Sequence, residues 1–295
     1  MIDYSNISII LPCFNEAENL SSFLPAICKT FNTAEIIIVD DGSTDESNSI
    51  AKKFPVKIIK HPRNLGNGAS IKTGARSATK QYLVFMDADG QHNPNDIPLL
   101  LQKIEEGYDM VVGARLAKSH ASLIRYTANT FYNKLASFMT GFKIEDLTSG
   151  FRAVNANKFK KILYLLPNGF SYPTTSTMAF FRSGYPVSYI PIQAASRKGT
   201  SKIKLLKDGT RFFLIILKIG ALFSPMRLFL PISLLFFLVA TSFYIYTFSA
   251  FGRFTNMSAL LYITSLLTFL IGIVSEQISS LHYRLSENDP ENKKN

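Results

Sequence analysis

Hydrophobic and polar positions divide the chain into two parts of different character. Up to about residue 115, short apolar runs of strand length alternate with longer segments in which apolar residues recur at helical spacing. The expected strands are residues 7–12, 35–41, 56–62, 82–86 and 109–115. The expected helices are residues 15–31, 48–54, 66–79 and 97–107. This alternation predicts an α/β domain with an open parallel sheet.

Two longer apolar stretches follow near the C-terminus. Between Arg227 and Arg253, and again between Arg253 and Glu276, no side chain is charged. Each stretch has about 20 residues or more, enough for a helix that crosses a bilayer, and a soluble protein rarely has two adjacent helices this apolar. We therefore expect a transmembrane hairpin. The expected boundaries are 226–281 for the hairpin, about 228–250 and 255–276 for its spans, and 282–295 for a tail.

The distribution of charge predicts how this hairpin is oriented. Two crossings place both ends of the chain on one side of the membrane, and the loop between them holds a single basic residue, Arg253. Most Lys and Arg residues precede the hairpin, so the positive-inside rule predicts a multi-pass protein of the cell (inner, cytoplasmic) membrane with its N-terminal region in the cytoplasm. The first residues are polar and predict no signal peptide. Cys13 and Cys28 are then expected to be ordinary reduced residues.

Basic residues are concentrated just before the hairpin. The chain has 32 Lys and Arg residues against 21 Asp and Glu residues, a formal net charge of +11. Four cations of the segment 203–225 share one helical face: Lys204, Lys207, Arg211 and Lys218. Beside membrane spans, this pattern predicts an interfacial amphipathic helix that contacts anionic lipid headgroups, and it does not favour nucleic acid as a partner.

An acid pair follows the apolar run 82–86. Asp87 and Asp89 repel each other if they are held close together, and a divalent cation with oxygen ligands would relieve that repulsion. Gln91 could supply a third oxygen. The sequence therefore allows a metal site here, and the alternative is a solvated turn closed by Gly90.

A second acid pair, Asp40 and Asp41, ends an earlier strand. Because the carboxyl ends of parallel strands meet at one edge of a sheet, the two acid pairs are expected to be neighbours. Asp40 or Asp41 would then accept hydrogen bonds from a nucleobase or a ribose. The alternative is an Asx turn in which Ser43 or Thr44 caps the following helix.

Six motifs in this order and spacing carry a resemblance to a known family. They read LPCFNEAENL, IIIVDDGSTDES, HPRNLGNGASIKTG, VFMDADGQHNP, VVGAR and DLTSGFR. Over about residues 7–202 the chain resembles inverting family 2 glycosyltransferases, and more narrowly the polyprenyl-phosphate glycosyltransferases that include dolichol-phosphate mannosyltransferase. The basic helix and hairpin resemble bacterial members that glycosylate undecaprenyl phosphate. The resemblance implies a catalytic domain at 1–202 with the GT-A fold, an open mixed, mostly parallel sheet.

The resemblance also implies roles for individual residues. The nucleotide of a UDP- or GDP-linked sugar would contact Pro12, Phe14, Glu16, Asp40 and Asp41. Mg²⁺ or Mn²⁺ would be held against the donor diphosphate by Asp87, Asp89 and Gln91. The phosphate of the acceptor lipid would contact Arg115, Arg125 and Asn129. The segment RKGTSK is one residue tighter than the usual motif, so the diphosphate would be reached by Arg197 or Lys198, with Ser201 and Lys202.

The nature of the acceptor decides which residues the chemistry needs. A phosphate monoester, with a second pKa of about 6, is largely ionised at pH 7 and needs positioning rather than a base. A neutral hydroxyl needs a base, for which Asp146 is the candidate, although Asp146 could equally cap a turn or pair with Arg152.

We therefore expect inverting transfer of a sugar to a polyprenyl phosphate. A transferase acting on diacylglycerol or another membrane lipid, and an inactive sugar-nucleotide-binding protein, are the alternatives. The chain has no Trp, which excludes the Q-x-x-R-W motif of processive polysaccharide synthases. The donor sugar and the oligomeric state, including a homo-oligomer, stay open.

Overall fold

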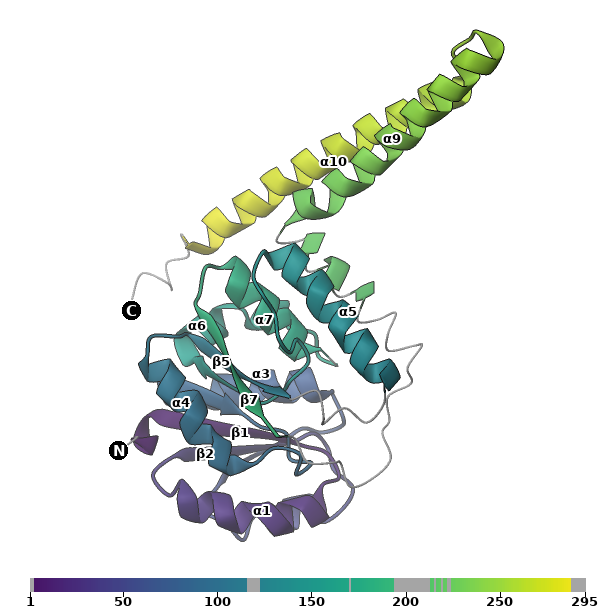
Figure 1. Cartoon of the computed structure of the whole chain (residues 1–295). Coiled ribbons are helices and arrows are strands. Elements are labelled where there is room, and N and C mark those ends of the chain that lie inside the picture. Colours follow the sequence, from purple (N-terminus) through teal and green to yellow (C-terminus); the bar gives the residue numbers. More distant parts are fainter. Residues whose placement is uncertain are drawn as a thin grey trace. The chain divides into compact units, whose positions relative to one another are not determined.

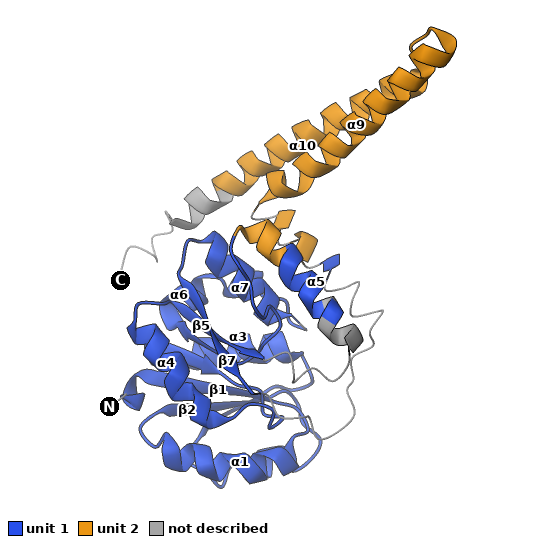
Figure 2. Ribbon diagram, in the orientation of Figure 1, with its two compact units in different colours: residues 1–135, 142–215 blue, residues 136–141, 216–295 orange. Residues whose placement is uncertain are grey.

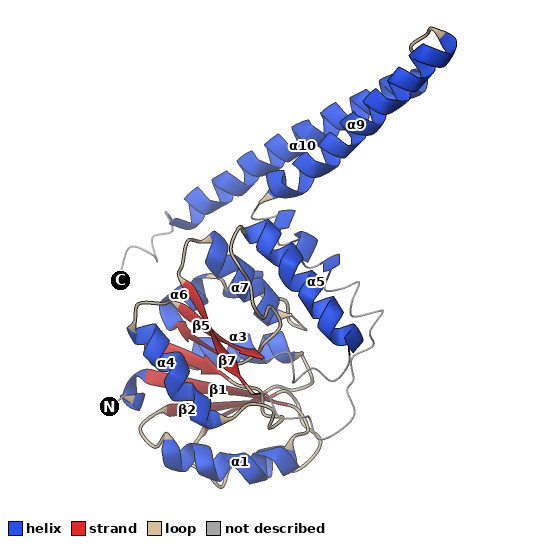
Figure 3. Cartoon of the chain, viewed as in Figure 1, coloured by secondary structure: helices blue, strands red, loops and turns tan. Residues whose placement is uncertain are grey.

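The computed structural model describes residues 3–115, 123–169, 171–193, 213–214, 216–218, 220–221 and 224–287. The chain divides into two compact units, coloured separately in Figure 2. Their ranges are 1–135 with 142–215, and 136–141 with 216–295. The first unit is built around a sheet, and the second around a pair of long helices (Figure 3).

Within the described residues, the first unit holds one seven-stranded sheet with the strand order β3-β2-β1-β4-β6-β5-β7. The strands are β1 (Ile7–Cys13), β2 (Glu35–Asp40), β3 (Lys57–Lys60), β4 (Tyr82–Phe85), β5 (Met110–Arg115), β6 (Arg152–Asn155) and β7 (Val187–Ile192). Every neighbouring pair is parallel except those of β6, which runs antiparallel to β4 and to β5. The expected strands and the mixed, mostly parallel sheet are confirmed.

Helices connect these strands and cover both faces of the sheet (Figure 1). They are α1 (Ala17–Thr30), α2 (Ser47–Ala51), α3 (Asn67–Ser77), α4 (Ile97–Glu105), α5 (Leu123–Thr140), α6 (Ala156–Lys161) and α7 (Tyr172–Arg182). Short 3₁₀ helices lie at Tyr4–Asn6, Pro94–Asp96 and Leu163–Leu165. The expected helices before residue 115 are confirmed, although α2 is only five residues long.

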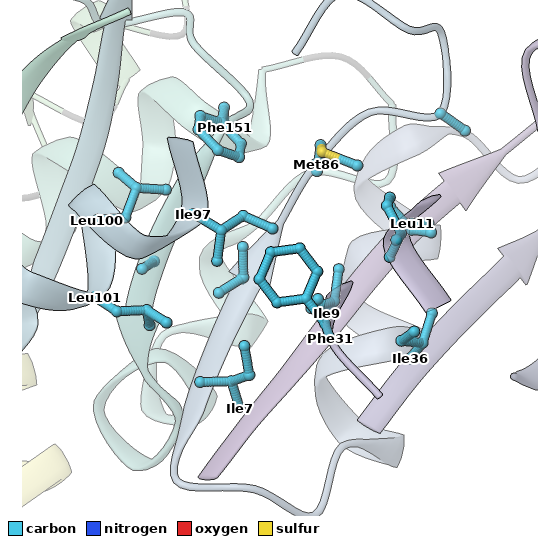
Figure 4. Packing of buried hydrophobic residues seen from close by; sticks show 14 of the residues in the cluster. Ile7, Ile9, Leu11, Phe31, Ile36, Met86, Ile97, Leu100, Leu101 and Phe151 are labelled. Atoms are coloured by element: carbon cyan, nitrogen blue, oxygen red, sulfur yellow. The ribbon is translucent and has the colours of Figure 1, made fainter. Parts of the chain in front are cut away.

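The alternation of side chains along β1 shows how the layers are assembled. Ile7, Ile9 and Leu11 belong to the buried cluster that α1 and α4 complete on one face of the sheet (Figure 4). Ile10 points to the opposite face, where Gly74 of α3 lies so close to it that a Cβ would not fit. Strand β1 is therefore buried on both faces, which explains its nearly continuous apolar sequence.

The strand directions bring the candidate residues to one edge of the sheet. Strands β1, β2 and β4 are parallel, and β5 runs in the same direction because β6 is antiparallel to both of its neighbours. Their carboxyl ends therefore share an edge, and β6 begins at that edge. The loops that carry both acid pairs, together with Arg115 and Arg152, lie along it.

The second unit contains α9 (Pro225–Phe251) and α10 (Asn256–Glu287), joined by a turn at Gly252. Small residues at seven-residue intervals are buried between the two helices. They are Ser233, Ala240 and Thr247 on α9 and Ser258, Ser265, Gly272 and Ser279 on α10. Each of Ser233 and Ser265 donates its hydroxyl hydrogen to the other's backbone oxygen at 2.9 Å.

These two helices are the ones, among the described residues, long and apolar enough to cross a membrane. Only 11% of the most apolar stretch of α9 and 17% of that of α10 are buried, so neither resembles the core helix of a soluble protein. The result agrees with the two spans expected from the sequence.

Candidate active site

The loops that follow β1 and β2 hold each other in place. Asn15 has a left-handed backbone conformation, with φ of 58°. Its side-chain oxygen accepts a hydrogen bond from the Thr44 backbone at 2.8 Å, and its own N–H donates to the Ser43 hydroxyl at 3.0 Å. Sequence reasoning missed Asn15, because only the structure shows that the loop after β1 meets the loop after β2.

The residues expected to line the nucleotide site from β1 are half-buried at this edge. Pro12 lies within β1, and Phe14 and Glu16 follow it. Glu16 accepts a hydrogen bond from the Asn19 side chain at 2.6 Å, and its N–H donates to the Ser47 hydroxyl at 3.0 Å. The structure thus gathers these residues beside the loop that carries Asp40 and Asp41.

Asp40 is buried, and its two oxygens meet the following loop and the start of helix α2. One accepts from the Ser43 N–H at 2.8 Å, and the other lies 3.3 Å from the Asn48 amide. The Ser43 contact agrees with the Asx turn given as the alternative for Asp40 and Asp41. The expected capping of the following helix by Ser43 or Thr44 is wrong. Helix α2 begins after Glu46, so neither Ser43 nor Thr44 is its N-cap.

Asp41 anchors a different loop. One oxygen accepts from the Leu65 N–H at 2.9 Å and lies 2.7 Å from Nδ1 of His61, and the other accepts from the Gly66 N–H at 2.8 Å. The second ring nitrogen of His61 lies 2.9 Å from the Thr73 hydroxyl. Asp41 is 3% exposed, and its hydrogen bonds hold residues 61–66 in place.

The acid motif lies in the loop after β4. Asp87, Asp89 and Gln91 are half-buried, and Asp89 accepts a hydrogen bond from the Gln91 N–H at 3.1 Å across a turn at Gly90. No cluster of three or more His, Cys, Asp or Glu residues that could hold a metal occurs among the described residues. Two carboxylates and an amide oxygen fit a divalent cation that shares its coordination with substrate phosphates, as Mg²⁺ commonly does.

His92 follows this motif and was not singled out from the sequence. Its ring stacks on Phe151, with centroids 5.2 Å apart and planes 15° from parallel. Burial lowers the pKa of His92 to about 4, although the charge of Asp89 opposes the shift. The imidazole is therefore neutral at pH 7.

Arg115 ends β5 and is held by Asp146. Its Nε donates to one carboxylate oxygen at 2.8 Å and its Nη2 to the other at 3.0 Å, and Nη2 also donates to the Thr148 hydroxyl. Asp146 further accepts hydrogen bonds from the backbone of Thr148 and Ser149 at 3.0 and 3.1 Å. The two-pronged face of Arg115 is thus turned toward Asp146.

The pairing with Arg115 determines the charge state that Asp146 favours. Burial would raise its pKa, but the hydrogen bonds and charge of Arg115 outweigh burial, and the pKa of Asp146 lies below its usual value. Arg152 is not its partner, because the Arg152 guanidinium donates to other groups. The turn-capping alternative for Asp146 is present in the structure.

The remaining predicted residues are only partly described. Asn129 lies on α5 and is half-buried. Arg125 is in the first turns of the same helix, but its side chain lies outside the described residues. The diphosphate-binding candidates of the RKGTSK segment also lie outside the described residues: Arg197, Lys198, Ser201 and Lys202.

Two models of known protein families match the chain. Residues 8–163, more than half of the chain, match the model of glycosyl transferase family 2. The chain belongs to this family. Residues 224–281 of the glycosyltransferase match a second model, the GtrB C-terminal hairpin, which covers α9 and most of α10.

Curated relatives agree with this assignment. The glycosyltransferase is 26% identical over 219 residues to a dolichyl-phosphate hexose transferase of Haloferax volcanii, covering 73% of this chain and 94% of the relative. It is 27% identical over 215 residues to a polyprenol monophosphomannose synthase of Mycolicibacterium smegmatis, covering 66% and 80%. It is 34% identical over 188 residues, 57% of each chain, to an undecaprenyl-phosphate 4-deoxy-4-formamido-L-arabinose transferase of Yersinia pestis.

Solved structures confirm the fold. Glucosyl-3-phosphoglycerate synthase from Mycobacterium tuberculosis, in complex with Mn²⁺, UDP and phosphoglyceric acid, matches with a TM-score of 0.61 at 17% identity. The match covers 73% of this chain and 78% of that chain. The same enzyme with Mg²⁺ and UDP also gives a TM-score of 0.61, at 18% identity over 73% and 79% of the two chains.

Proposed function

We propose that this glycosyltransferase transfers a sugar, with inversion, from a UDP- or GDP-linked donor to a polyprenyl phosphate at the cytoplasmic face of the cell membrane. The pairing of Asp146 with Arg115 carries the proposal. A carboxylate with a lowered pKa that already accepts several hydrogen bonds is a poor proton acceptor. An acceptor that arrives ionised needs none. The names of the three relatives support the same acceptor class.

The cationic side of the site would orient the acceptor. Within the described residues, Nη1 of Arg115 has no hydrogen-bond acceptor, so this nitrogen is left for a phosphate oxygen. Arg125 and Asn129, one helical turn apart on α5, would extend the contact. Holding the ionised phosphate in line with the anomeric carbon converts an encounter in solution into a positioned attack.

The acidic side of the site would face the donor. Asp87, Asp89 and Gln91 would hold Mg²⁺ or Mn²⁺, and a bound cation supplies neutralisation of the charge that develops on the leaving diphosphate. Arg197 or Lys198, with Ser201 and Lys202, would add to that neutralisation. Pro12, Phe14, Glu16, Asp40 and Asp41 would surround the nucleotide. Asp87 follows β4 and Arg115 ends β5, and the carboxyl ends of these strands lie at the same edge of the sheet.

The membrane part of the proposal depends on the helix pair. A catalytic unit joined to two apolar helices would work at the lipid surface, where a polyprenyl phosphate presents its headgroup. The basic segment 203–225 would contact anionic lipids there.

The experiment that tests this function compares matched acceptors. Purified protein would be incubated with a panel of radiolabelled sugar nucleotides and either undecaprenyl phosphate, undecaprenol or diacylglycerol. We expect a labelled lipid product only with undecaprenyl phosphate, because undecaprenol has the same chain without the ionised group. A product with undecaprenol or diacylglycerol would contradict the proposal, and donor binding without any product would indicate a binding protein.

A further inference from the structure

One segment of the site leads into the antiparallel strand β6, whereas the two acid pairs lie at the ends of the parallel strands β2 and β4. We call residues 149–152 the rear segment; it contains Ser149, Gly150, Phe151 and Arg152. Phe151 anchors the segment in the hydrophobic core (Figure 4) and stacks on His92. Gly150 lies against Asp87, and Arg152 donates a hydrogen bond to Ser149 beside it.

Gly150 lies directly against the Asp87 carboxylate. A Cβ built on Gly150 would lie 2.7 Å from the Asp87 Oδ2 atom and 3.3 Å from the Tyr172 hydroxyl. Its backbone is not left-handed, so the position requires a glycine for space and not for conformation. Any side chain at position 150 would therefore have to displace the carboxylate or the backbone behind it.

The backbone behind Gly150 is tied down. Tyr172 donates its hydroxyl hydrogen to the Gly150 carbonyl at 2.9 Å. Arg152 donates to the Ser149 carbonyl through Nη2. Since both carbonyls are bonded to fully buried side chains, the rear segment cannot easily retreat from Asp87.

Among the described residues, Arg152 is held by hydrogen bonds and forms no ion pair. Its side chain is 0% exposed, and its Nη1 donates to the Pro173 carbonyl, the Ser176 hydroxyl and the Thr177 hydroxyl, at 3.1, 2.8 and 3.0 Å. Burial lowers the pKa of Arg152, and the charges of Asp146 and Asp87 act in the opposite direction.

We propose that Gly150 and Arg152 are positioning residues for Asp87. Gly150 leaves the space that the carboxylate occupies, and Arg152 fixes the backbone beside Gly150. The carboxylate is thereby set for a divalent cation before the substrates bind. This inference rests on the proposed role of Asp87 as a metal ligand.

The test is a titration of the full-length protein with Mn²⁺ alone, with free Mn²⁺ followed by electron paramagnetic resonance. Gly150→Ala is compared with Gly169→Ala, a matched control, because a Cβ at Gly169 meets no atom within 4 Å. We expect Gly150→Ala to raise the Kd for Mn²⁺ by about tenfold or more, the usual effect of disturbing a residue that orients a metal ligand. Gly169→Ala should bind Mn²⁺ like the wild type.

Thermal unfolding of each variant separates positioning from folding. A merely structural role would lower the melting temperature of Gly150→Ala and leave its Kd unchanged, which would overturn the inference. If Gly150→Ala lacks a cooperative transition, Arg152→Lys decides by the same titration: weaker Mn²⁺ binding supports the inference, and a wild-type Kd overturns it. A wild type that binds no Mn²⁺ would also overturn the inference, because it would show that Asp87 is not set for the cation before the substrates bind.

Discussion

At the scale of residues, the site separates carboxylates by their surroundings. Asp41 and Asp146 are buried and bonded to groups that fix loops or orient an arginine. Asp87 and Asp89 are only half-buried at the sheet edge. The same residue type therefore has two kinds of role here, and the hydrogen-bond partners of each carboxylate distinguish them.

Replacing Asp146 by Asn tests the acceptor chemistry. Asn keeps an oxygen for Arg115 but removes the charge, so we expect a higher KM for the lipid and a kcat reduced by less than the factor of about 10² to 10⁴ that loss of a general base costs. Any acidic limb of the pH–rate profile should persist in the variant, because it would report the acceptor phosphate, with its pKa of about 6. Loss of that limb together with kcat would assign Asp146 as the base.

Metal removal tests the other side of the site. We expect EDTA to abolish transfer and added Mn²⁺ or Mg²⁺ to restore it, and Asp89→Ala to lower kcat by about a hundredfold or more, the scale of losing one electrostatic stabiliser. Asp96→Ala, which removes a nearby carboxylate at the end of a 3₁₀ helix, is the control and should retain activity. Full activity in EDTA would refute the metal requirement.

The sequence predicted where the aspartates of the site lie better than it predicted the role of each. Residue types at strand ends are visible in the sequence, because a buried strand has a recognisable apolar run. Which carboxylate oxygens bind a loop is not visible, since the partners of Asp41 lie 20 to 25 residues away. Gly150 shows the same limit, because only the structure places it against Asp87.

At the scale of elements, β6 and α7 were not predicted from the sequence, and each omission has a physical cause. Strand β6 has four residues and starts with a charged one, so it shows no periodic pattern. Helix α7 buries a polar run, and its Ser176 and Thr177 are inside because the buried Arg152 needs acceptors. A buried helix whose polar side chains accept hydrogen bonds from an arginine cannot be recognised by hydrophobic periodicity.

The helix pair gives a prediction about packing. Ser265→Leu should destabilise the hairpin by about 1–3 kcal/mol, because a larger side chain is forced into a close helix contact and the hydrogen bonds with Ser233 are lost. The measurement is thermal unfolding in detergent. Leu266→Phe is the control, since Leu266 is 58% exposed on the outer face of the same helix. Equal stability of the two variants would contradict the close packing of small residues between α9 and α10.

Helix α5 gives a prediction about the lipid surface. Phe131 and Phe138, seven residues apart on one face, are 55% and 54% exposed. The Phe138 carbonyl accepts a hydrogen bond from Arg227, near the start of the apolar helix α9, at 2.9 Å. If α9 enters the membrane there, Phe138 lies at headgroup level, where aromatic side chains are favoured.

Because the chain has no Trp, a single Trp reports this position without background. Phe138→Trp should be quenched by brominated lipids in vesicles and should emit at shorter wavelength than in water. Tyr164→Trp, at a position 61% exposed on a 3₁₀ helix, is the control and should be quenched by aqueous acrylamide instead. Equal acrylamide quenching at both positions would argue against a membrane contact of α5.

At the scale of the whole molecule, sequence and structure agree on an unusual division of surface. The sheet-containing unit buries its apolar residues, whereas α9 and α10 expose most of theirs. Exposed apolar surface on this scale needs a covering, and two helices of 27 and 26 apolar-rich residues match the thickness of a bilayer.

The last prediction concerns that topology. With two crossings, a reporter fused after Asn295 should lie on the same side as the catalytic unit, and one inserted at Arg253 should lie on the opposite side. The excess of Lys and Arg before the hairpin predicts that the catalytic side is the cytoplasm. Fluorescent protein, which fluoresces in the cytoplasm, should therefore be active at the C-terminus, and alkaline phosphatase, which needs an oxidising compartment, should be active at Arg253. Alkaline phosphatase active after Asn295 would refute this topology, because it would require an odd number of crossings or the reverse orientation.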